Sequence, residues 1–373
     1  MNPKQLLSYF LIFFSTMLLA SAQKDSTKLE LSGYVDTYYS RYSSDRADDS
    51  FPQYVITSPR HNEFGLNIAQ IGAHYEADKI RGSAVIHFGD IPNVIWSPAF
   101  PAIQQAWVGT KITEGLWLDG GFFLTHIGTE SFAPKDNFLS TTAVATFIDP
   151  FFQSGLRLTY DRREKFKAEL HLVNGLNRFE DDNGSKSIGV FLSYDFSDKF
   201  TLCYSNLYGT ESSFDSGDDL FYNNLYANWN FAENFSLLFG GNLSTLRQFS
   251  AAGGNANQTD NNYSWLYSAL ATVNYRCFEK VGFSARYEFF KDEDGFLSGT
   301  FLTEQLSREG PQLQGLTFGV EYNPTETSYI RSEYRLAWTQ PGLLIFREGS
   351  NRTNNRQEFS LTMGFYFREL INR

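Results

Sequence analysis

The stretch EFSLTMGFYF, Glu358–Phe367, lies six residues from the C-terminus, and its polar and apolar residues alternate. In an extended chain, successive side chains point to opposite faces. One face of this segment would then carry only large apolar groups, and aromatic rings would stand at both of its ends. A soluble β-sandwich and a membrane barrel both use such strands, so the rest of the chain has to decide between them.

Segments of the same kind recur along the whole chain, and we count about sixteen of them. Their lengths are mostly near ten residues, which is about what a tilted strand needs to cross a bilayer. The segments are 29–42, 62–75, 80–89, 103–112, 115–126, 152–160, 165–175, 186–195, 199–209, 219–230, 234–246, 263–275, 280–291, 315–322, 327–339 and 357–367.

The connections between these segments alternate in length. Short turns such as Glu76–Lys79 and Asn323–Glu326 alternate with long polar loops such as 43–61, 127–151 and 292–314. Outer-membrane barrels show this asymmetry, with short turns in the periplasm and long loops outside the cell. An even number of strands would also place both chain ends on the side of the short turns.

Tyrosines mark the ends of several predicted strands, next to the short turns, where one interfacial girdle of a membrane barrel would lie. They are Tyr75, Tyr160, Tyr194, Tyr275 and Tyr322. A sandwich gives no reason for this placement. We therefore predict an all-β fold, a transmembrane antiparallel up-and-down β-barrel of about sixteen strands over 23–373. In the second segment the apolar residues change parity, which predicts a β-bulge near Ala69.

The composition supports strands rather than membrane helices. The chain has 36 Phe, 21 Tyr and 6 Trp, so aromatics make up 17% of it, yet its mean hydropathy is below zero. No apolar run of about 18 residues follows Ala22, which excludes a helical membrane bundle. The two cysteines, Cys203 and Cys277, offer no disulfide framework, and whether they are free or bridged stays open.

The first 22 residues have the features of a signal peptide. Lys4 precedes an apolar run, Leu6–Ala20, and Ala20-Ser21-Ala22 fits the small residues of a cleavage site. We predict a signal peptide over 1–22 and export to the outer membrane. Removing it takes away Lys4 and no acid, so the formal net charge changes from −11 to −12. Such acidity argues against nucleic acid or an anionic membrane surface as a partner.

The sequence contains no recognisable catalytic or cofactor chemistry. Its five histidines, His61, His74, His87, His126 and His171, form no metal-ligand spacing. No G-x-S-x-G motif is present, and a pairing of His171 with Ser154 could arise by chance in any barrel. We predict no enzyme activity, no metal and no cofactor.

Charged residues stand in the middle of strands on the face opposite the apolar side chains, so we predict that they line a pore. They are Asp36, Arg81, Lys111, Asp119, Arg157, Lys167, Glu169, Arg286, Glu288, Glu321, Arg331, Glu333 and Arg335. Two interpretations remain open. The charges could neutralise one another in a filled lumen, or they could face water and orient a polar solute.

The loop Gly128–Asp149 contains an apolar patch, Ala143–Ile148, which is unusual for an exposed loop. We expect it to fold into the barrel and narrow the pore, which would bring Glu130, Lys135 and Asp136 near the solute. Glu130 and Asp136 would then face Arg157 and Lys167 across a constriction. The alternative is that the loop covers the outer mouth or packs on another loop.

Several motifs, taken in order, carry a family resemblance. They are SGYVDTYYS (32–40), IQQAWVG (103–109), FFLTHIGTES (122–131), KDN (135–137), FFQSGLRLTYD (151–161), HLVNGLN (171–177) and KSIGVFLSYD (186–195). Over about 30–230 the chain resembles the OmpL-like β-barrel porin family of Gram-negative outer membranes. The resemblance implies an outer-membrane channel, and it implies no particular substrate and no catalytic residue.

These observations lead to a functional hypothesis with one alternative. We expect a porin for passive diffusion of small hydrophilic solutes, surrounded by outer-membrane lipid. Whether it forms a homo-oligomer stays open. Its last strand resembles the signal that the outer-membrane assembly machinery reads. The alternative is a structural or adhesive barrel with a closed lumen and loops that bind a partner.

Overall fold

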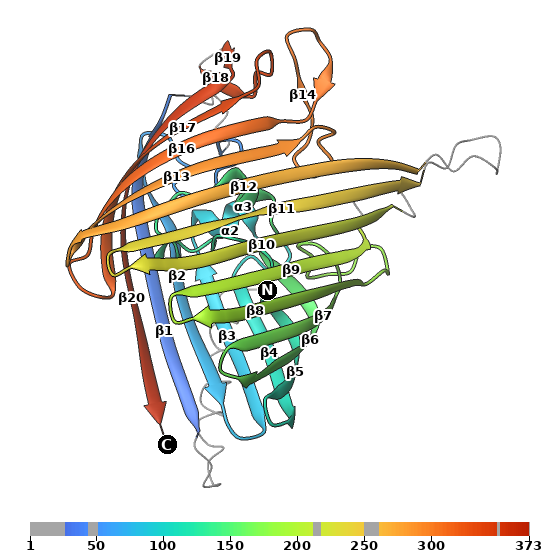
Figure 1. Ribbon diagram of the computed structural model, residues 1–373, viewed down its shortest axis with the longest axis vertical. Helices are drawn as coiled ribbons and strands as arrows, with labels where there is room; N and C mark the ends of the chain where they lie inside the picture. The colour runs from blue at the N-terminus through green and yellow to red at the C-terminus, as the bar shows by residue number, and fades with distance from the viewer. Residues whose placement is uncertain (1–26, 44–50, 212–217, 250–260, 349–350, 373) are drawn as a thin grey trace, which may run out of the picture.

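The structure is a computed structural model that describes residues 27–43, 51–211, 218–249, 261–348 and 351–372. Sixteen antiparallel strands form a closed barrel in chain order (Figure 1), which confirms the predicted fold. The predicted signal peptide lies outside the described residues. The barrel strands are β1 (Lys28–Tyr42), β2 (Glu63–Glu76), β3 (Ile80–Phe88), β4 (Ile103–Thr113), β5 (Leu116–Leu124), β6 (Phe152–Arg163), β7 (Phe166–Val173), β8 (Ser187–Ser197), β9 (Phe200–Thr210), β10 (Asp219–Ala232), β11 (Phe235–Phe249), β12 (Asn261–Phe278), β13 (Val281–Asp292), β16 (Gln312–Tyr322), β17 (Ser328–Thr339) and β20 (Asn355–Asn372).

The remaining elements all lie in the long loops, and the alternation of sequence did not predict them. They are α2 (Asp90–Ile95), the 3-10 turn η1 (Pro134–Asp136), α3 (Val144–Ile148), and the small hairpins of β14 (Phe301–Leu302) with β15 (Arg308–Glu309) and β18 (Phe346–Glu348) with β19 (Asn351–Thr353). The helices of the described residues lack the length and the apolar content to cross a bilayer.

The first and last strands close the barrel. β1 pairs with β20 in one unbroken register that runs from Lys28 opposite Asn372 to Tyr42 opposite Glu358. β20 therefore continues past Phe367, where the predicted strand ends, because the start of β1 still offers it backbone partners. The alternation within β20 follows the prediction, since Phe359 and Phe365 are exposed on the outer face.

A β-bulge in β2 explains the change of parity in that strand. Asp36 of β1 lies opposite Ile68, but the next residue, Thr37, lies opposite Leu66, so Asn67 is the extra residue. The predicted bulge is confirmed, two residues from Ala69. The Asn67 side chain turns inward and donates a hydrogen bond to Asp36 (Nδ2 to Oδ1, 2.7 Å), so the bulge places an amide on an inward carboxylate.

The outer surface is apolar and the inner surface is polar, which is the reverse of a soluble sandwich. Large apolar side chains that are at least 50% exposed include Ile80, Val108, Phe278, Phe318 and Phe365. Tyr194 and Tyr322 are exposed at the short-turn ends of β8 and β16, where a girdle was predicted. The strands therefore present lipid-compatible side chains outward, and the functional groups must be sought inside.

Candidate pore and its inward loop

The loop between β5 and β6, residues 125–151, lies inside the barrel, and we call it the inward loop. Its apolar segment Ala143–Ile148 includes α3, whose Val144 and Ile148 are buried. Burying apolar surface stabilises by roughly 25 cal/mol per Å², so inward-facing apolar side chains give this segment a place to pack. Barrel side chains that share a buried cluster with it are Leu266, Phe290, Leu313 and Ala337.

Two carboxylates of the barrel wall hold the backbone of the inward loop. Glu333 of β17 accepts hydrogen bonds from the Ser140 amide, from the Thr141 amide (3.0 Å) and from the Thr141 hydroxyl (2.6 Å). Glu288 of β13 accepts one from the amide of Val144 (2.6 Å). These amides would otherwise be buried without a partner, which costs about 1–3 kcal/mol each. The acids therefore fix the course of the loop.

Two arginines of the same wall also bind the inward loop, as hydrogen-bond donors. Arg286 donates to Glu130 of the loop (Nη1 to Oε1, 2.9 Å) and to the carbonyl oxygen of Thr141 (2.5 Å). Arg331 donates to the carbonyl oxygen of Pro134 (2.6 Å). The Arg286 side chain has no exposed surface, and that of Glu130 is 3% exposed. The loop thus completes an ion-pair network of the wall.

The network continues along the wall away from the loop. Arg335 donates to Glu288 (2.7 Å) and to Glu358 (3.3 Å), and Arg356 also pairs with Glu358 (2.6 Å). All of these side chains are buried. The predicted pore-lining residues of β13 and β17 therefore point inward, but most of them lie beneath the inward loop rather than beside open water. The alternation of β20 also places Arg356 and Glu358 inward, although the predicted set omits both.

The opposite wall, formed by β3 to β7, carries charges that the inward loop leaves partly uncovered. Asp119 of β5 binds Arg81 of β3 and Arg157 of β6, whose side chains are 12% and 17% exposed. Lys167, 47% exposed, pairs with Glu169 (2.8 Å). These residues belong to the predicted pore-lining set.

Two further predicted residues lie apart from this group. Lys111 pairs with Asp78 near the short turns (3.2 Å). Asp36 has no exposed surface and accepts hydrogen bonds from Asn67 (2.7 Å) and from the hydroxyl of Tyr329, so it is enclosed by polar partners. Asp36 is therefore part of the packed wall near the bulge.

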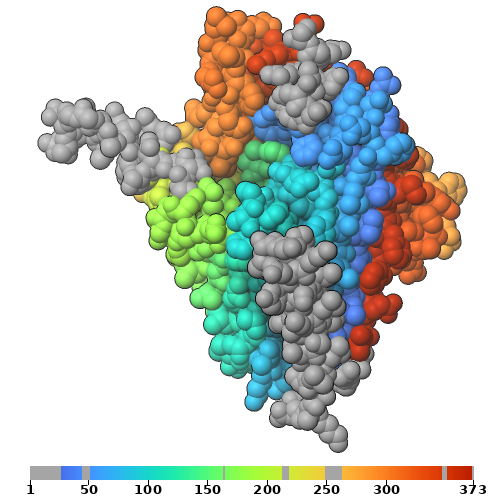
Figure 2. Space-filling model, turned by 180° about the vertical axis from the view of Figure 1, so that it is seen from behind, coloured from blue at the N-terminus to red at the C-terminus, as the bar shows by residue number. Residues whose placement is uncertain are grey.

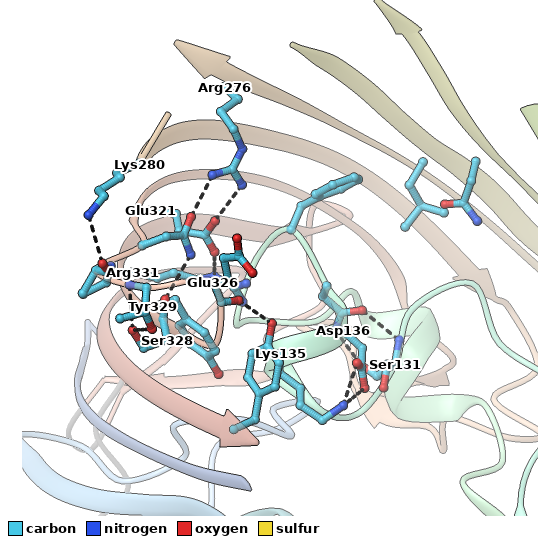
Figure 3. A pocket seen from close by; sticks show the side chains of 18 of the residues that line it. Ser131, Lys135, Asp136, Arg276, Lys280, Glu321, Glu326, Ser328, Tyr329 and Arg331 are labelled. Atoms are coloured by element: carbon cyan, nitrogen blue, oxygen red, sulfur yellow. Dashed lines mark hydrogen bonds and ion pairs between the residues drawn. The ribbon is translucent and has the colours of Figure 1, made fainter. Parts of the chain in front are cut away.

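A cavity of about 920 Å³ lies between the inward loop and the short-turn rim (Figure 3). Charged side chains of both signs border it: Lys135 and Asp136 from the loop, Arg276, Glu279, Lys280, Glu321, Glu326 and Arg331 from the barrel. Lys135 pairs with Asp136 (2.7 Å), and its ammonium lies 5.8 Å from the ring centroid of Tyr34. The cavity is therefore polar and close to neutral.

The three loop residues predicted at a constriction do not stay together. Lys135 and Asp136 border the cavity, whereas Glu130 is buried against Arg286. Glu130 consequently does not face Arg157 or Lys167 across the lumen. The pairing of Glu130 with Arg286 spans 156 residues of sequence, and no local pattern could have indicated it.

The end of the inward loop carries a buried acid. Asp149 accepts hydrogen bonds from the Tyr222 hydroxyl (2.5 Å) and the Asn242 amide (2.8 Å). The pKa of Asp149 is raised to about 7, chiefly by burial and also by the nearby Glu130, although the two hydrogen bonds lower it. The attachment of the loop at this end therefore depends on the protonation of one carboxyl group.

The histidines are spread among polar contacts. His126 and His171 stack with their ring centroids 3.8 Å apart, and His171 also contacts Glu169 (3.0 Å). Within the described part of the chain, no three His, Cys, Asp or Glu side chains gather as a metal site would require. Cys203 and Cys277 are both free thiols.

Comparison with known proteins agrees with this architecture. The family model described as "Putative beta-barrel porin-2, OmpL-like" matches residues 28–368. No curated protein matches the chain in sequence.

Similar solved structures come from several Gram-negative bacteria. An anion-selective porin from Comamonas acidovorans is 11% identical, with a TM-score of 0.60 over 91% of this chain and 100% of that chain. A loop L8 deletion mutant of OmpT, an outer membrane protein of Vibrio cholerae, is 12% identical, with a TM-score of 0.59 over 92% of this chain and 100% of that chain. The outer membrane channel DcaP of Acinetobacter baumannii is 10% identical, with a TM-score of 0.59 over 93% of this chain and 99% of that chain. At these identities the likeness shows the fold alone.

Proposed function

We propose that this chain, which belongs to the OmpL-like β-barrel porin family, forms a water-filled channel for passive diffusion of small hydrophilic solutes. Family and fold make it a porin-like barrel of the outer membrane. The observation that carries the proposal is the polar cavity of about 920 Å³ beside the inward loop. A sixteen-stranded barrel is too wide for wall side chains alone to fill, so water can occupy what the loop leaves open.

The inward loop is the proposed constriction. Its Lys135 and Asp136 would meet the solute, while Glu130 would act indirectly by holding the loop on Arg286. Among the wall residues, those with exposed surface in the lumen, such as Arg81, Arg157 and Lys167, are the proposed pore-lining charges. The buried charges of β13 and β17 would set the position of the loop.

Single-channel recording of the refolded protein in planar bilayers tests the channel. We expect steady open-state current in the wild type and a clearly larger current after deletion of 133–146, because the deletion removes most of the loop. A folded, heat-modifiable barrel that stays silent would favour the alternative, a closed barrel whose long loops bind a partner. Unchanged current in a folded deletion variant would refute the constriction while leaving the channel intact.

We also propose that the protein is exported and assembled in the outer membrane, and that it has no catalytic role. Mass spectrometry of the protein from outer membranes should find Gln23 as the first residue, after removal of 1–22. The terminal aromatic strand is the proposed contact with the outer-membrane assembly machinery. We propose that the protein is not an enzyme and needs no cofactor, because its family and its fold are those of porins.

We further propose that the outer face of β2 to β5 contacts a second copy of the chain. Among the described residues, aromatic side chains that are strongly exposed on β2 to β5 are Phe64 and Phe88, both at the long-loop ends. The middle of this face carries aliphatic and small residues, with Ala84 paired to Ala106. Figure 2 shows part of the outer surface of the first strands, in blue to cyan, beside the red of β20. Small residues permit close approach of backbones in membranes.

Native mass spectrometry in mild detergent tests this contact. An oligomer that Ala106→Trp converts to monomers, while Ala269→Trp on the outer face of β12 does not, would support it. A wild-type protein that is monomeric in detergent and does not cross-link in native membranes would refute it.

A further inference from the structure

One row of paired residues crosses the barrel wall from β3 to β6. Arg81 lies opposite Gly109, Gly109 opposite Asp119, and Asp119 opposite Arg157. Asp119 has no exposed surface and receives both arginines: Arg81 through Nε and Nη2 (2.7 Å each), and Arg157 through Nε (3.0 Å) and Nη2 (2.9 Å). One carboxylate therefore serves two guanidinium groups, and the row keeps one positive charge in excess.

Gly109 is required for this arrangement. A Cβ atom at this position would lie 2.0 Å from Oδ1 of Asp119 and 3.2 Å from Cγ of Arg81. Any side chain larger than hydrogen would thus displace the carboxylate that joins the two arginines. The backbone of β4 leaves the space in which the acid and both bases meet.

Aromatic rings fix the planes of the two guanidinium groups. The guanidinium carbon of Arg81 lies 4.7 Å from the ring centroid of Trp117, and that of Arg157 lies 5.1 Å from both Trp107 and Phe123. Stacking on aromatic faces and hydrogen bonds to one carboxylate leave little freedom to either side chain. The arginines are therefore held in place before any ligand arrives.

Each of the two arginines keeps one nitrogen, Nη1, that can donate to a ligand. Nε and Nη2 of both side chains are used by Asp119, and Nη1 of neither has a hydrogen-bond partner among the described residues. Both side chains retain exposed surface on the lumen side. The ammonium of Lys167 on the neighbouring strand is 47% exposed and pairs with Glu169, so it adds no net charge. Fixed guanidinium donors match the geometry of carboxylate oxygens.

We propose that Arg81 and Arg157 form a subsite for the carboxylate group of a small organic acid passing through the lumen. The inference rests on the proposed channel function and names its class of solute. Nη1 of each arginine donates to the carboxylate, and Trp107 lies beside the carbon skeleton. Phosphate shares the anionic oxygens, but it lacks a flat apolar part that could lie along the indole.

The test uses succinate as the probe, with inorganic phosphate and glucose for comparison. Block of single-channel current and quenching of tryptophan fluorescence are both titrated in the refolded full chain. We expect succinate to act in both measurements at lower concentration than phosphate, and glucose to have no effect. In Arg81→Gln/Arg157→Gln the half-saturating succinate concentration should rise at least about tenfold, because two charge-assisted hydrogen bonds are lost.

Two matched variants separate a built site from bulk charge. Arg276→Gln removes an arginine of β12 that borders the cavity but lies outside the row, and it should leave the succinate response unchanged. Gly109→Ala keeps every charge but displaces Asp119, so it should weaken the response. If Arg276→Gln weakens it as much as the double variant, or if Gly109→Ala leaves it unchanged in a folded barrel, the site is not built as proposed.

Failure of the channel and failure of the subsite give different results. A silent barrel whose fluorescence still responds to succinate would overturn the channel and keep the subsite. A conducting barrel in which succinate changes neither current nor fluorescence would overturn the subsite alone. An equal response to phosphate and succinate would reject the assignment to carboxylates.

Discussion

The two charged walls inside the barrel use the same residue types in different ways. On the wall of β13, β17 and β20, the buried Arg286 and Glu333 bind the inward loop, and the buried Arg335 binds acids of the same wall. On the wall of β3 to β6, Arg81 and Arg157 share one acid and keep exposed surface. Inward orientation alone therefore does not make a charge part of the pore, because the cover provided by a loop decides what it can contact.

The largest effect should follow from removing a covered arginine. In Arg286→Met the acid of Glu130 would lose its partner in a buried site, which costs about 3–5 kcal/mol. We expect a lower free energy of unfolding in urea, followed by tryptophan fluorescence, and a larger channel current as the loop loosens. The control Arg368→Met changes an ion pair whose arginine is 72% exposed, and it should cost less than about 1 kcal/mol. Equal costs would show that the buried ion pair of Arg286 with the loop contributes no more than an exposed one.

A smaller effect should follow from weakening one anchor without leaving a buried charge. Glu333→Gln replaces one acceptor oxygen by a donor that faces the amides of Ser140 and Thr141. We expect a loss of about 1–3 kcal/mol and a noisier, larger current. Glu326→Gln, which changes an acid bordering the cavity, is the matched control and should keep the wild-type stability. If the current of Glu333→Gln has the same size and noise as that of the wild type, other residues hold the loop.

The attachment of the loop should also depend on pH through Asp149. Its pKa is about 7 in the folded protein and about 3.9 in an unfolded chain. Between these values the folded state binds more protons, so the free energy of unfolding falls as pH rises. From pH 6 to pH 8 the contribution of Asp149 to the free energy of unfolding should fall by about 1 kcal/mol. The channel current should rise over the same range as the loop loosens. Asp149→Asn should abolish this part of the pH dependence; an unchanged slope would contradict the assignment.

The smallest effect should come from an exposed charge of the uncovered wall. Lys167→Gln removes an amine that is 47% exposed and should shift the reversal potential in a salt gradient slightly toward cations. The shift should vanish near 1 M salt, where charges are screened beyond about 3 Å. Arg331→Gln should change the reversal potential less, since Arg331 is buried against Glu321 and Pro134. A larger shift for Arg331→Gln would reverse the roles of the two walls.

Alternation along the chain was sufficient to predict the strands and the direction of each charge, because both depend on a period of two residues. It could even indicate the bulge near Ala69 from a change of parity. It could not predict which charges are covered, since that depends on where the inward loop lies. The apolar patch Ala143–Ile148 was a signal that this loop would be buried, but not of the acids that would hold it.

The row from Arg81 to Arg157 shows the same limit. Its charged residues Arg81, Asp119 and Arg157 were predicted to point inward. The four strands nevertheless had to be placed in register before Gly109 could be recognised as the gap that admits Asp119. Register depends on turn conformations and bulges, such as the shift between Val85 and Ile86. Partnerships across several strands therefore lay beyond what periodicity can resolve.

The pairing of β1 with β20 has a consequence for how the protein acquires its structure. The contact joins residues near the two ends of the chain, from Lys28 with Asn372 to Tyr42 with Glu358. Contacts so distant in sequence form slowly, because the loop that they close is costly in entropy. A nascent or truncated chain therefore carries two open strand edges, which are templates for aggregation. The cylinder is completed only when β20 is available to pair with β1, so a lesion in β20 should impair the whole protein.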